Sequence, residues 1–250
     1  MEADAVKSYF ERAEVVADYA RAVDEVGLWK SEEAVICALV PKDAAVLELG
    51  CGAGRIGINL ARRGYTNVLS TDFSENMVKI AEAIGARDGL KMSFAVCDAT
   101  APALPDESFD AAIFGFNGLM QIPKSENRET AAREIFRALK PGGIFVFTTH
   151  DREVPAHRRY WESEEKQWAH GVQDPRLDDF GDIYYKGEHG NIFIHSPSKD
   201  EVAEMLERAG FETLFAKRRS EIAQENASVE EFSDDCIFWA AKKPAPQKIL

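Results

Sequence analysis

Residues 46–57 read VLELGCGAGRIG, and this stretch decides the fold of the chain. An apolar run ends in three glycines at alternate positions, Gly50, Gly52 and Gly54, and a helical pattern follows them. Glycine has no Cβ and adopts positive φ readily, so a ligand can lie against the backbone of such a loop. The first turn of the helix directs its free N–H groups at the same spot. The stretch therefore predicts a strand, a loop and a helix that bind a nucleotide or a nucleoside.

Two kinds of ligand-binding loop fit this stretch. Residues 52–57 form a G-x-G-x-x-G pattern with Asp72 about twenty residues later, as in dinucleotide-binding enzymes. Residues 48–54 equally fit the E/D-x-G-x-G-x-G loop of methyltransferases that bind S-adenosylmethionine (SAM). Glu48 favours the second interpretation, because a carboxylate repels a pyrophosphate and attracts the α-ammonium group of SAM.

Length and composition indicate one α/β domain over residues 1–250 with an insertion. The chain has 250 residues, of which 45% are hydrophobic, enough for one sizeable core. It has no apolar run long enough to span a membrane, and its acidic N-terminus is unlike a secretory signal. The four cysteines are scattered without a C-x-x-C pair, which argues against a metal site and a disulfide framework. We therefore expect a cytoplasmic protein without a bound metal.

The charge balance argues against a nucleic-acid partner. The formal net charge is −13, from 43 acidic and 30 basic residues, and the nearest approach to a basic cluster is at residues 217–219. A protein that follows a phosphate backbone needs a basic face. A small molecule is the expected partner.

Strand and helix patterns alternate along the chain, which predicts a doubly wound, mostly parallel sheet. Ser31 and Ser74 are placed to cap helices. The helices before the first strand form a helical cap over residues 1–40. The expected helices are 4–25, 31–39, 54–63, 75–86, 126–139 and 199–209, and the expected strands are 45–49, 68–72, 91–96, 109–116, 144–149, 211–217 and 235–242.

Polar residues follow the predicted strands at the edge where an open parallel sheet binds its ligand. Asp72 follows the second strand and is placed to accept hydrogen bonds from the hydroxyls of a ribose. Asp98 and Ala99 follow the third, where a carboxylate and a backbone N–H can meet an adenine ring. Asn117 follows the fourth strand and His150 the fifth. A dehydrogenase would also use Asp72 but does not need the acid at the third strand.

The chain resembles a class I SAM-dependent methyltransferase, close to the group that methylates quinone precursors and other small molecules. The resemblance covers about residues 45–150 and rests on five motifs in register: residues 47–55, 72–77, 97–99 with Leu104-Pro105, 108–110 and 139–143. It implies a seven-stranded Rossmann-like sheet and SAM as the cofactor. By this resemblance Glu48 and the glycine loop hold the methionine moiety, Asp72 the ribose and Asp98 the adenine, with Met77 near the purine and Asn117 near the sulfonium. The cofactor-binding residues so implied are Glu48, Gly50, Cys51, Gly52, Gly54, Asp72, Phe73, Met77, Asp98, Ala99 and Asn117.

The predicted acceptor pocket is an aromatic-rich insertion over residues 151–197. Trp161, Tyr185 and other aromatics of this segment follow the fifth strand, near the expected position of the cofactor's methyl group, and His195 would add a polar contact. Aromatics of the N-terminal helices, such as Tyr19, fold over the same opening or pack the helices. The alternative use of the insertion is a contact in a homodimer.

His150 is the best-placed candidate for a general base, because it follows the fifth strand. The fourth strand is followed by residues 116–119, FNGL, instead of the Asn/Asp-Pro-Pro-Tyr/Phe motif of enzymes that methylate amino groups of nucleic-acid bases and peptide amides. The sequence thus predicts transfer of a methyl group from SAM to a small-molecule acceptor. The alternatives are an RNA-modifying methyltransferase, an NAD-binding oxidoreductase and a SAM-binding protein without catalysis.

Overall fold

The computed structural model describes residues 3–246, and its main sheet has seven strands. These are β1 (Val46–Glu48), β2 (Val68–Asp72), β3 (Ser93–Val96), β4 (Phe109–Phe114), β5 (Leu139–Thr149), β8 (Glu212–Arg218) and β9 (Ile237–Lys242). Their order is β3-β2-β1-β4-β5-β9-β8, and β9 runs antiparallel to β5 and β8 while the other neighbouring pairs are parallel. The predicted seven-stranded, mostly parallel, Rossmann-like sheet is confirmed.

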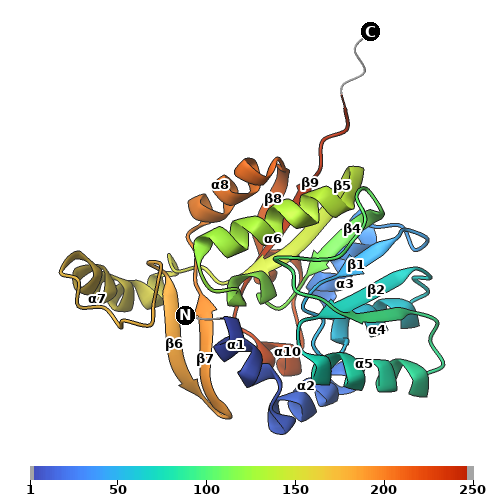
Figure 1. The fold of residues 1–250 in the computed structure, drawn as a ribbon, viewed down its shortest axis with the longest axis horizontal. Coiled ribbons are helices and arrows are strands. Elements are labelled where there is room, and N and C mark those ends of the chain that lie inside the picture. The colour runs from blue at the N-terminus through green and yellow to red at the C-terminus, as the bar shows by residue number, and fades with distance from the viewer. Residues whose placement is uncertain (1–2, 247–250) are drawn as a thin grey trace.

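Helices surround this sheet, and a separate hairpin stands beside it (Figure 1). The hairpin consists of β6 (Asp182–Gly187) and β7 (Gly190–His195). The α-helices are α1 (Ala3–Phe10), α2 (Ala13–Glu25), α3 (Lys30–Leu39), α4 (Arg55–Arg62), α5 (Glu75–Arg87), α6 (Ser125–Ala138), α7 (Arg158–Ala169), α8 (Lys199–Ala209), α9 (Arg219–Ile222) and α10 (Ala227–Phe232), with 3-10 turns η1 (Gly118–Gln121) and η2 (Pro155–His157).

Both faces of the sheet are buried, which explains the nearly continuous apolar runs of its central strands. In β1, Leu47 packs with residues of α6 and α8, whereas Val46 packs with residues of α3 and α4. In β5, Phe145 faces the first of these clusters and Val146 packs toward Trp29 and Val35 on the opposite side. Alternate side chains therefore enter different helical layers, as the period of two in a strand requires.

The order of the strands determines where the ligand-binding edge of the sheet lies. β1 pairs with β2 on one side and with β4 on the other, so the chain changes direction beside β1. Ligands of open α/β sheets bind beyond the carboxyl ends of the strands at this point. Residues that follow β1, β2, β3 and β4 therefore converge there.

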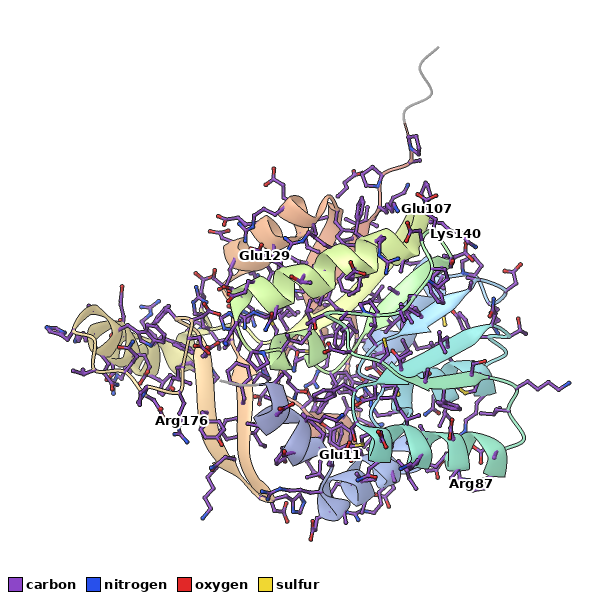
Figure 2. The ribbon with its side chains drawn as sticks, in the orientation of Figure 1. Glu11, Arg87, Glu107, Glu129, Lys140 and Arg176 are labelled. Carbon is purple, nitrogen blue, oxygen red and sulfur yellow. The ribbon has the colours of Figure 1, made fainter. Side chains whose placement is uncertain are left out.

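The expected helix over residues 4–25 is two helices, because the chain turns at Glu11 and Arg12. The N-terminus of α5 takes over the hydrogen bonds of this turn: Glu11 Oε1 accepts from the Glu75 N–H at 2.9 Å, and the Glu11 carbonyl accepts from Asn76 Nδ2 at 3.0 Å. Figure 2 labels Glu11 at this junction. The bond from Asn76 thus replaces the helical bond that the Glu11 carbonyl would accept in a continuous helix, while the Glu11 N–H still donates to the Lys7 carbonyl at 3.0 Å.

Two further details of the sequence interpretation are wrong. Trp29, and not Ser31, is the N-cap of α3, and the side chain of Glu225 accepts the Lys30 and Ser31 N–H groups at 3.0 and 2.8 Å. β5 begins at Leu139, directly after α6, and not at residue 144. Residues 142 and 143 are drawn into the sheet because they exchange backbone hydrogen bonds with Lys243, at 2.8 and 2.9 Å.

The segment over residues 151–197 has regular structure that the sequence interpretation missed. It contains η2, α7 and the hairpin, and α7 projects away from the body of the protein (Figure 1). The strands β6 and β7 pair residue for residue up to Gly187 and Gly190, so residues 188–189 form a two-residue turn. Burial does not alternate along either strand, so the sequence of the hairpin shows no period of two.

A buried ionic network anchors the base of the hairpin. His195 is fully buried, with Nδ1 2.8 Å from Asp182 and Nε2 2.6 Å from Glu201 on α8. Arg152 also pairs with Glu201, at 2.7 Å, and Arg128 lies 3.9 Å from Asp182. His195 therefore links the hairpin to α8. The sequence interpretation expected His195 to be a polar contact in the acceptor pocket, but the buried side chain does not face a ligand cavity.

Candidate functional site

The glycine loop connects β1 to α4 and lies directly against two aromatic side chains. Gly50 and Gly52 have φ values of +58° and +54°, in the left-handed region that favours glycine. A Cβ on Gly50 would lie 2.5 Å from the Phe114 ring, and one on Gly52 would lie 2.7 Å from the Tyr19 ring. The loop thus needs glycine for its conformation and for its packing.

The Glu48 carboxylate ties the glycine loop region to the sheet. Its Oε2 accepts from the Gly57 N–H at 3.0 Å and from Ser70 Oγ at 2.5 Å. Burial raises the pKa of Glu48 to about 7, while these hydrogen bonds oppose the rise. Glu48 also lines the cavity described below. One carboxylate oxygen is therefore engaged by the protein, and Oε1 makes no hydrogen bond with another group of residues 3–246.

Asp72 joins the second strand to the glycine loop. Its Oδ2 accepts from the Gly52 N–H at 2.8 Å, and its Oδ1 accepts from the Ser74 N–H at 2.9 Å. Burial raises the pKa of Asp72 to about 6, against the effect of these N–H donors. An ionised carboxylate has about four acceptor positions, so two remain for a ligand. Ser74 caps α5, as predicted, by accepting from the Met77 N–H.

Asp98 marks the carboxyl end of β3. Its Oδ1 accepts from the Thr100 N–H at 2.8 Å and from Thr100 Oγ1 at 2.7 Å, which fixes the turn after the strand. Within residues 3–246 its Oδ2 has no hydrogen-bond partner. Asp98 and Ala99 both line the cavity. A carboxylate oxygen thus remains available to a ligand.

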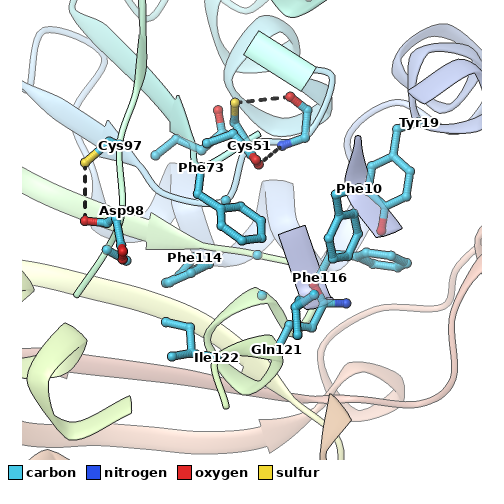
Figure 3. Close-up of a pocket in the computed structure, with 18 of the residues that line it drawn as sticks. Phe10, Tyr19, Cys51, Phe73, Cys97, Asp98, Phe114, Phe116, Gln121 and Ile122 are labelled. Carbon is cyan, nitrogen blue, oxygen red and sulfur yellow. Dashed lines mark hydrogen bonds between the residues drawn. The ribbon is translucent and has the colours of Figure 1, made fainter. Parts of the chain in front are cut away.

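These residues open into one cavity at the predicted edge of the sheet (Figure 3). About 1150 Å³ is free of protein atoms, including the part open to solvent. Asp98 lies at one end in Figure 3, Tyr19 and Phe10 lie at the other, and Phe73 lies between them. The cavity brings together Glu48, Gly50, Cys51, Gly52, Asp72, Phe73, Asp98 and Ala99 of the predicted site.

Four predicted residues lie outside the lining of the cavity. Gly54 is the N-cap of α4, and Met77 is fully buried beside Phe10 and other core residues. Asn117 is buried and does not line the cavity, and its Nδ2 lies 3.2 Å from His150 Nε2. Its Oδ1 is buried without a partner among residues 3–246. Burial lowers the pKa of His150, which favours a neutral imidazole.

The helices α1 and α2 cover one side of the cavity, and we call them its roof; their lining residues are Ala3, Val6, Phe10, Tyr19 and Ala22. No residue of segment 151–197 lines the cavity. The Arg12 guanidinium donates to the carbonyl of His189 in the hairpin turn, and His189 lies 2.5 Å from Asp18 of α2. The turn of the hairpin therefore contacts Arg12 and Asp18 of the roof region without reaching the cavity. The predicted acceptor-binding role of 151–197 stays a prediction.

The sequence interpretation expected the aromatics of the N-terminal helices either at this opening or in packing between helices, and Tyr19 and Phe10 line the cavity. Other lining residues were missed. Gln121 follows β4 closely, but nothing in its local pattern marks it. Phe232 comes from the far end of the chain. The remaining unpredicted lining residues are Ala3, Val6, Ala22, Arg55, Ile56, Cys97, Thr100, Phe114, Gly115, Phe116, Gly118, Ile122, Pro123 and Asn127.

Comparison with known proteins agrees with the site. Residues 46–143 match the family model of a methyltransferase domain. The 2-methyl-6-phytyl-1,4-hydroquinone methyltransferase of Synechocystis sp. is 34% identical over 140 residues, which are 52% of this chain and 42% of the relative. The chain spans less than half of the length of the curated relatives it matches. The match of residues 46–143 to this family model confirms the predicted resemblance to SAM-dependent methyltransferases.

Solved structures share the fold over most of the chain. A SAM-dependent methyltransferase of Methanosarcina mazei superposes with a TM-score of 0.69 at 21% identity, covering 84% of this chain and 97% of the other. The [4+2]-cyclase SpnF gives 0.66 at 19% identity, covering 96% and 95%. The family match implies SAM as the cofactor. The cyclase shows that this fold also serves other chemistry, so the fold alone does not establish the reaction.

Proposed function

We propose that the chain transfers the methyl group of SAM to a small-molecule acceptor. One observation carries the proposal: a single cavity joins the glycine loop to an apolar space beneath the roof helices. Bound SAM would supply a methyl group activated by its positive sulfur. The protein has to hold the acceptor in line with that methyl group and exclude water.

The residues of the cavity fit SAM. The glycine loop and Glu48 Oε1 would hold the methionine moiety, and Glu48 Oε2 is already engaged by the protein. Asp72 would accept from the ribose hydroxyls with its two remaining positions, and Asp98 Oδ2 from the adenine amino group. The phosphate of a dinucleotide would instead meet Glu48, Asp72 and Asp98 in one cavity.

The transfer needs one bond to form and one to break. A lone pair of the acceptor forms the bond to the methyl carbon, and the pair of the breaking S–C bond returns to sulfur. Any proton on the acceptor atom leaves to a base or to water. His150 remains a candidate base, but it contacts Asn117 and does not line the cavity, so we assign it no step.

A small molecule is the proposed partner, and the charge of −13 argues against RNA. The cysteines Cys37, Cys51, Cys97 and Cys236 are all free, which fits the reducing cytoplasm that we propose. Among residues 3–246 no helix is long and apolar enough to cross a membrane. A homodimer remains a prediction.

Calorimetry with SAM, S-adenosylhomocysteine (SAH) and NAD tests the cofactor. We expect heats for SAM and SAH and none for NAD; the reverse would refute the proposal. Methyl-labelled SAM then tests the reaction with a panel of small molecules and with bulk tRNA. Label in a small molecule supports the proposal, label in tRNA with salt-sensitive binding supports the RNA alternative, and SAM binding without transfer supports a non-catalytic protein.

A further inference from the structure

The cavity continues past the glycine loop into a space that the proposed cofactor contacts leave unassigned. We name it the aromatic chamber, and its walls are Phe10, Tyr19, Phe116, Gln121 and Phe232. The ring of Phe116 stacks on Phe232 with centroids 4.8 Å apart and planes inclined by 23°. Tyr19 meets Phe116 edge-on at 6.2 Å and Phe10 at 6.0 Å. Such walls suit a flat apolar body, because aromatic rings pack face to face and edge to face.

Two neutral polar groups face this chamber without partners. The Tyr19 hydroxyl and the Gln121 amide make no hydrogen bond with any group of residues 3–246. The amide of Asn127, by contrast, donates to the Pro123 carbonyl at 3.0 Å. Figure 3 shows Tyr19 and Gln121 on different sides of the chamber. A ligand that displaces water from these groups has to replace their hydrogen bonds.

The charged side chains that line the cavity leave an anionic acceptor in the chamber without a free cation. Among the described lining residues Arg55 is the one cation, and its guanidinium already binds Glu32 through two bonds of 2.7 and 2.6 Å. It also stacks over Trp29 at 4.8 Å. The other charged lining residues are the acids Glu48, Asp72 and Asp98. An anion would therefore enter without a partner, at a high desolvation cost.

A cationic acceptor is disfavoured for a different reason. The sulfonium of bound SAM is positive, and a positive acceptor would have to lie against it in surroundings of low polarity. An ammonium group also lacks the free lone pair that attacks the methyl carbon. We propose, on the basis of the proposed function, that the aromatic chamber binds an uncharged, flat, apolar acceptor whose polar substituents hydrogen-bond to Tyr19 and Gln121.

The test uses 2-naphthol, which is uncharged at pH 7, and 2-naphthoate, which is an anion of the same flat shape. Calorimetry measures both with saturating SAH, whose sulfur is neutral, and again without SAH. We expect 2-naphthol to bind at least about tenfold more tightly than 2-naphthoate, because the anion finds no partner.

Two variants assign the preference to the chamber. Gln121→Lys places a cation there and should improve 2-naphthoate binding about tenfold, whereas Gln167→Lys on the projecting α7 should not. Tyr19→Phe removes one neutral hydrogen bond and should weaken 2-naphthol roughly 3- to 10-fold while SAH affinity is retained. Tyr160→Phe, on the exposed surface of α7, is the matched control.

Four results overturn the inference. They are equal or tighter binding of 2-naphthoate by the parent protein, no binding of 2-naphthol at millimolar concentration, no gain of 2-naphthoate binding in Gln121→Lys, and equal weakening of SAH and 2-naphthol in Tyr19→Phe. The last would show that the cofactor fills the chamber. Absence of SAH binding would refute the proposed function, while the titrations without SAH still report the charge preference of the chamber.

Discussion

Replacement of Asp72 by Asn separates a ligand-binding role from a structural one. The side chain is 6% exposed and accepts two backbone N–H groups, from Gly52 and Ser74. Burial raises its pKa from 3.8 to about 6. A carboxyl group with a raised pKa stabilises the fold below its unfolded pKa of about 4 and loses that contribution as the pH rises through about 6.

The expected change in stability is small because two effects oppose each other. A shift of roughly 2 pKa units means that ionised Asp72 costs the folded state about 3 kcal/mol at pH 8, and Asp72→Asn removes this cost. The amide, however, leaves one of the two N–H donors without an acceptor, which costs about 1–3 kcal/mol. We therefore expect the free energy of unfolding at pH 8 to change by less than about 2 kcal/mol.

The expected change in ligand affinity is large. Hydrogen bonds from ribose hydroxyls to an ionised carboxylate contribute roughly 1.5–3 kcal/mol, so Asp72→Asn should weaken SAH binding roughly 10- to 150-fold at pH 8. Calorimetry gives the affinity, and urea unfolding at pH 5 and pH 8 gives the stability.

Asp110 offers a matched control at the opposite end of the sheet. It accepts the Ala45 N–H at 2.8 Å and pairs with Lys140 at 2.8 Å. Asp110→Asn should alter stability and leave SAH affinity unchanged. SAH binding by Asp72→Asn within twofold of the parent would refute the ribose assignment. A loss of more than about 4 kcal/mol of stability at pH 8 would show that the side chain is mainly structural.

Three further results are expected. SAH affinity should rise between pH 5 and pH 7, because the ribose hydroxyls need ionised Asp72 as their acceptor and burial raises the pKa of Asp72 to about 6. Calorimetry that gives the same affinity over this range would contradict the assignment. His195→Leu should lower the free energy of unfolding, measured with urea, by roughly 3 kcal/mol, because it leaves buried Asp182 without its imidazole partner. The SAH affinity of this variant, measured by calorimetry, should stay within a few-fold of the parent's. Gly52→Ala should weaken SAH binding at least about tenfold in calorimetry. The new Cβ would lie 2.7 Å from the Tyr19 ring, on a residue with a φ of +54°, so the glycine loop or the roof would have to move. Unchanged binding would show that the loop tolerates the methyl group.

The sheet and the glycine loop were predictable because their signals are local. The stretch over residues 46–57 carries strand, loop and helix in one piece, and Asp72 and Asp98 follow strands whose apolar runs are plain. Parallel strands bring their carboxyl ends to one edge, so the position of each acid along the chain determined its position in space. No tertiary contact had to be known.

The roof and the aromatic chamber were only partly predictable, because the aromatics of the N-terminal helices fitted this opening and packing between helices equally well, and the other contacts are distant in the sequence. The turn at Glu11 exists because that residue bonds to the N-terminus of α5, more than sixty positions away. Phe232 reaches the cavity by stacking on Phe116, and their separation along the chain leaves no periodic pattern. The aromatics of 151–197 formed a clearer pattern, but Trp161 and Trp168 pack on Phe180 and not on the cavity.

The difference between the cofactor contacts and the chamber limits what the relatives indicate about the acceptor. The family match ends at residue 143 and begins at residue 46, so it includes the glycine loop, Asp72 and Asp98. It also includes Phe116 and Gln121, but Tyr19 and Phe232 lie outside it. Phe10 also lies outside the match, so a relative can share every proposed cofactor contact and still differ at three of the five chamber residues. Because most walls of the proposed acceptor chamber come from the roof helices and α10, the identity of the acceptor has to be inferred mainly from these elements, which lie outside the family match.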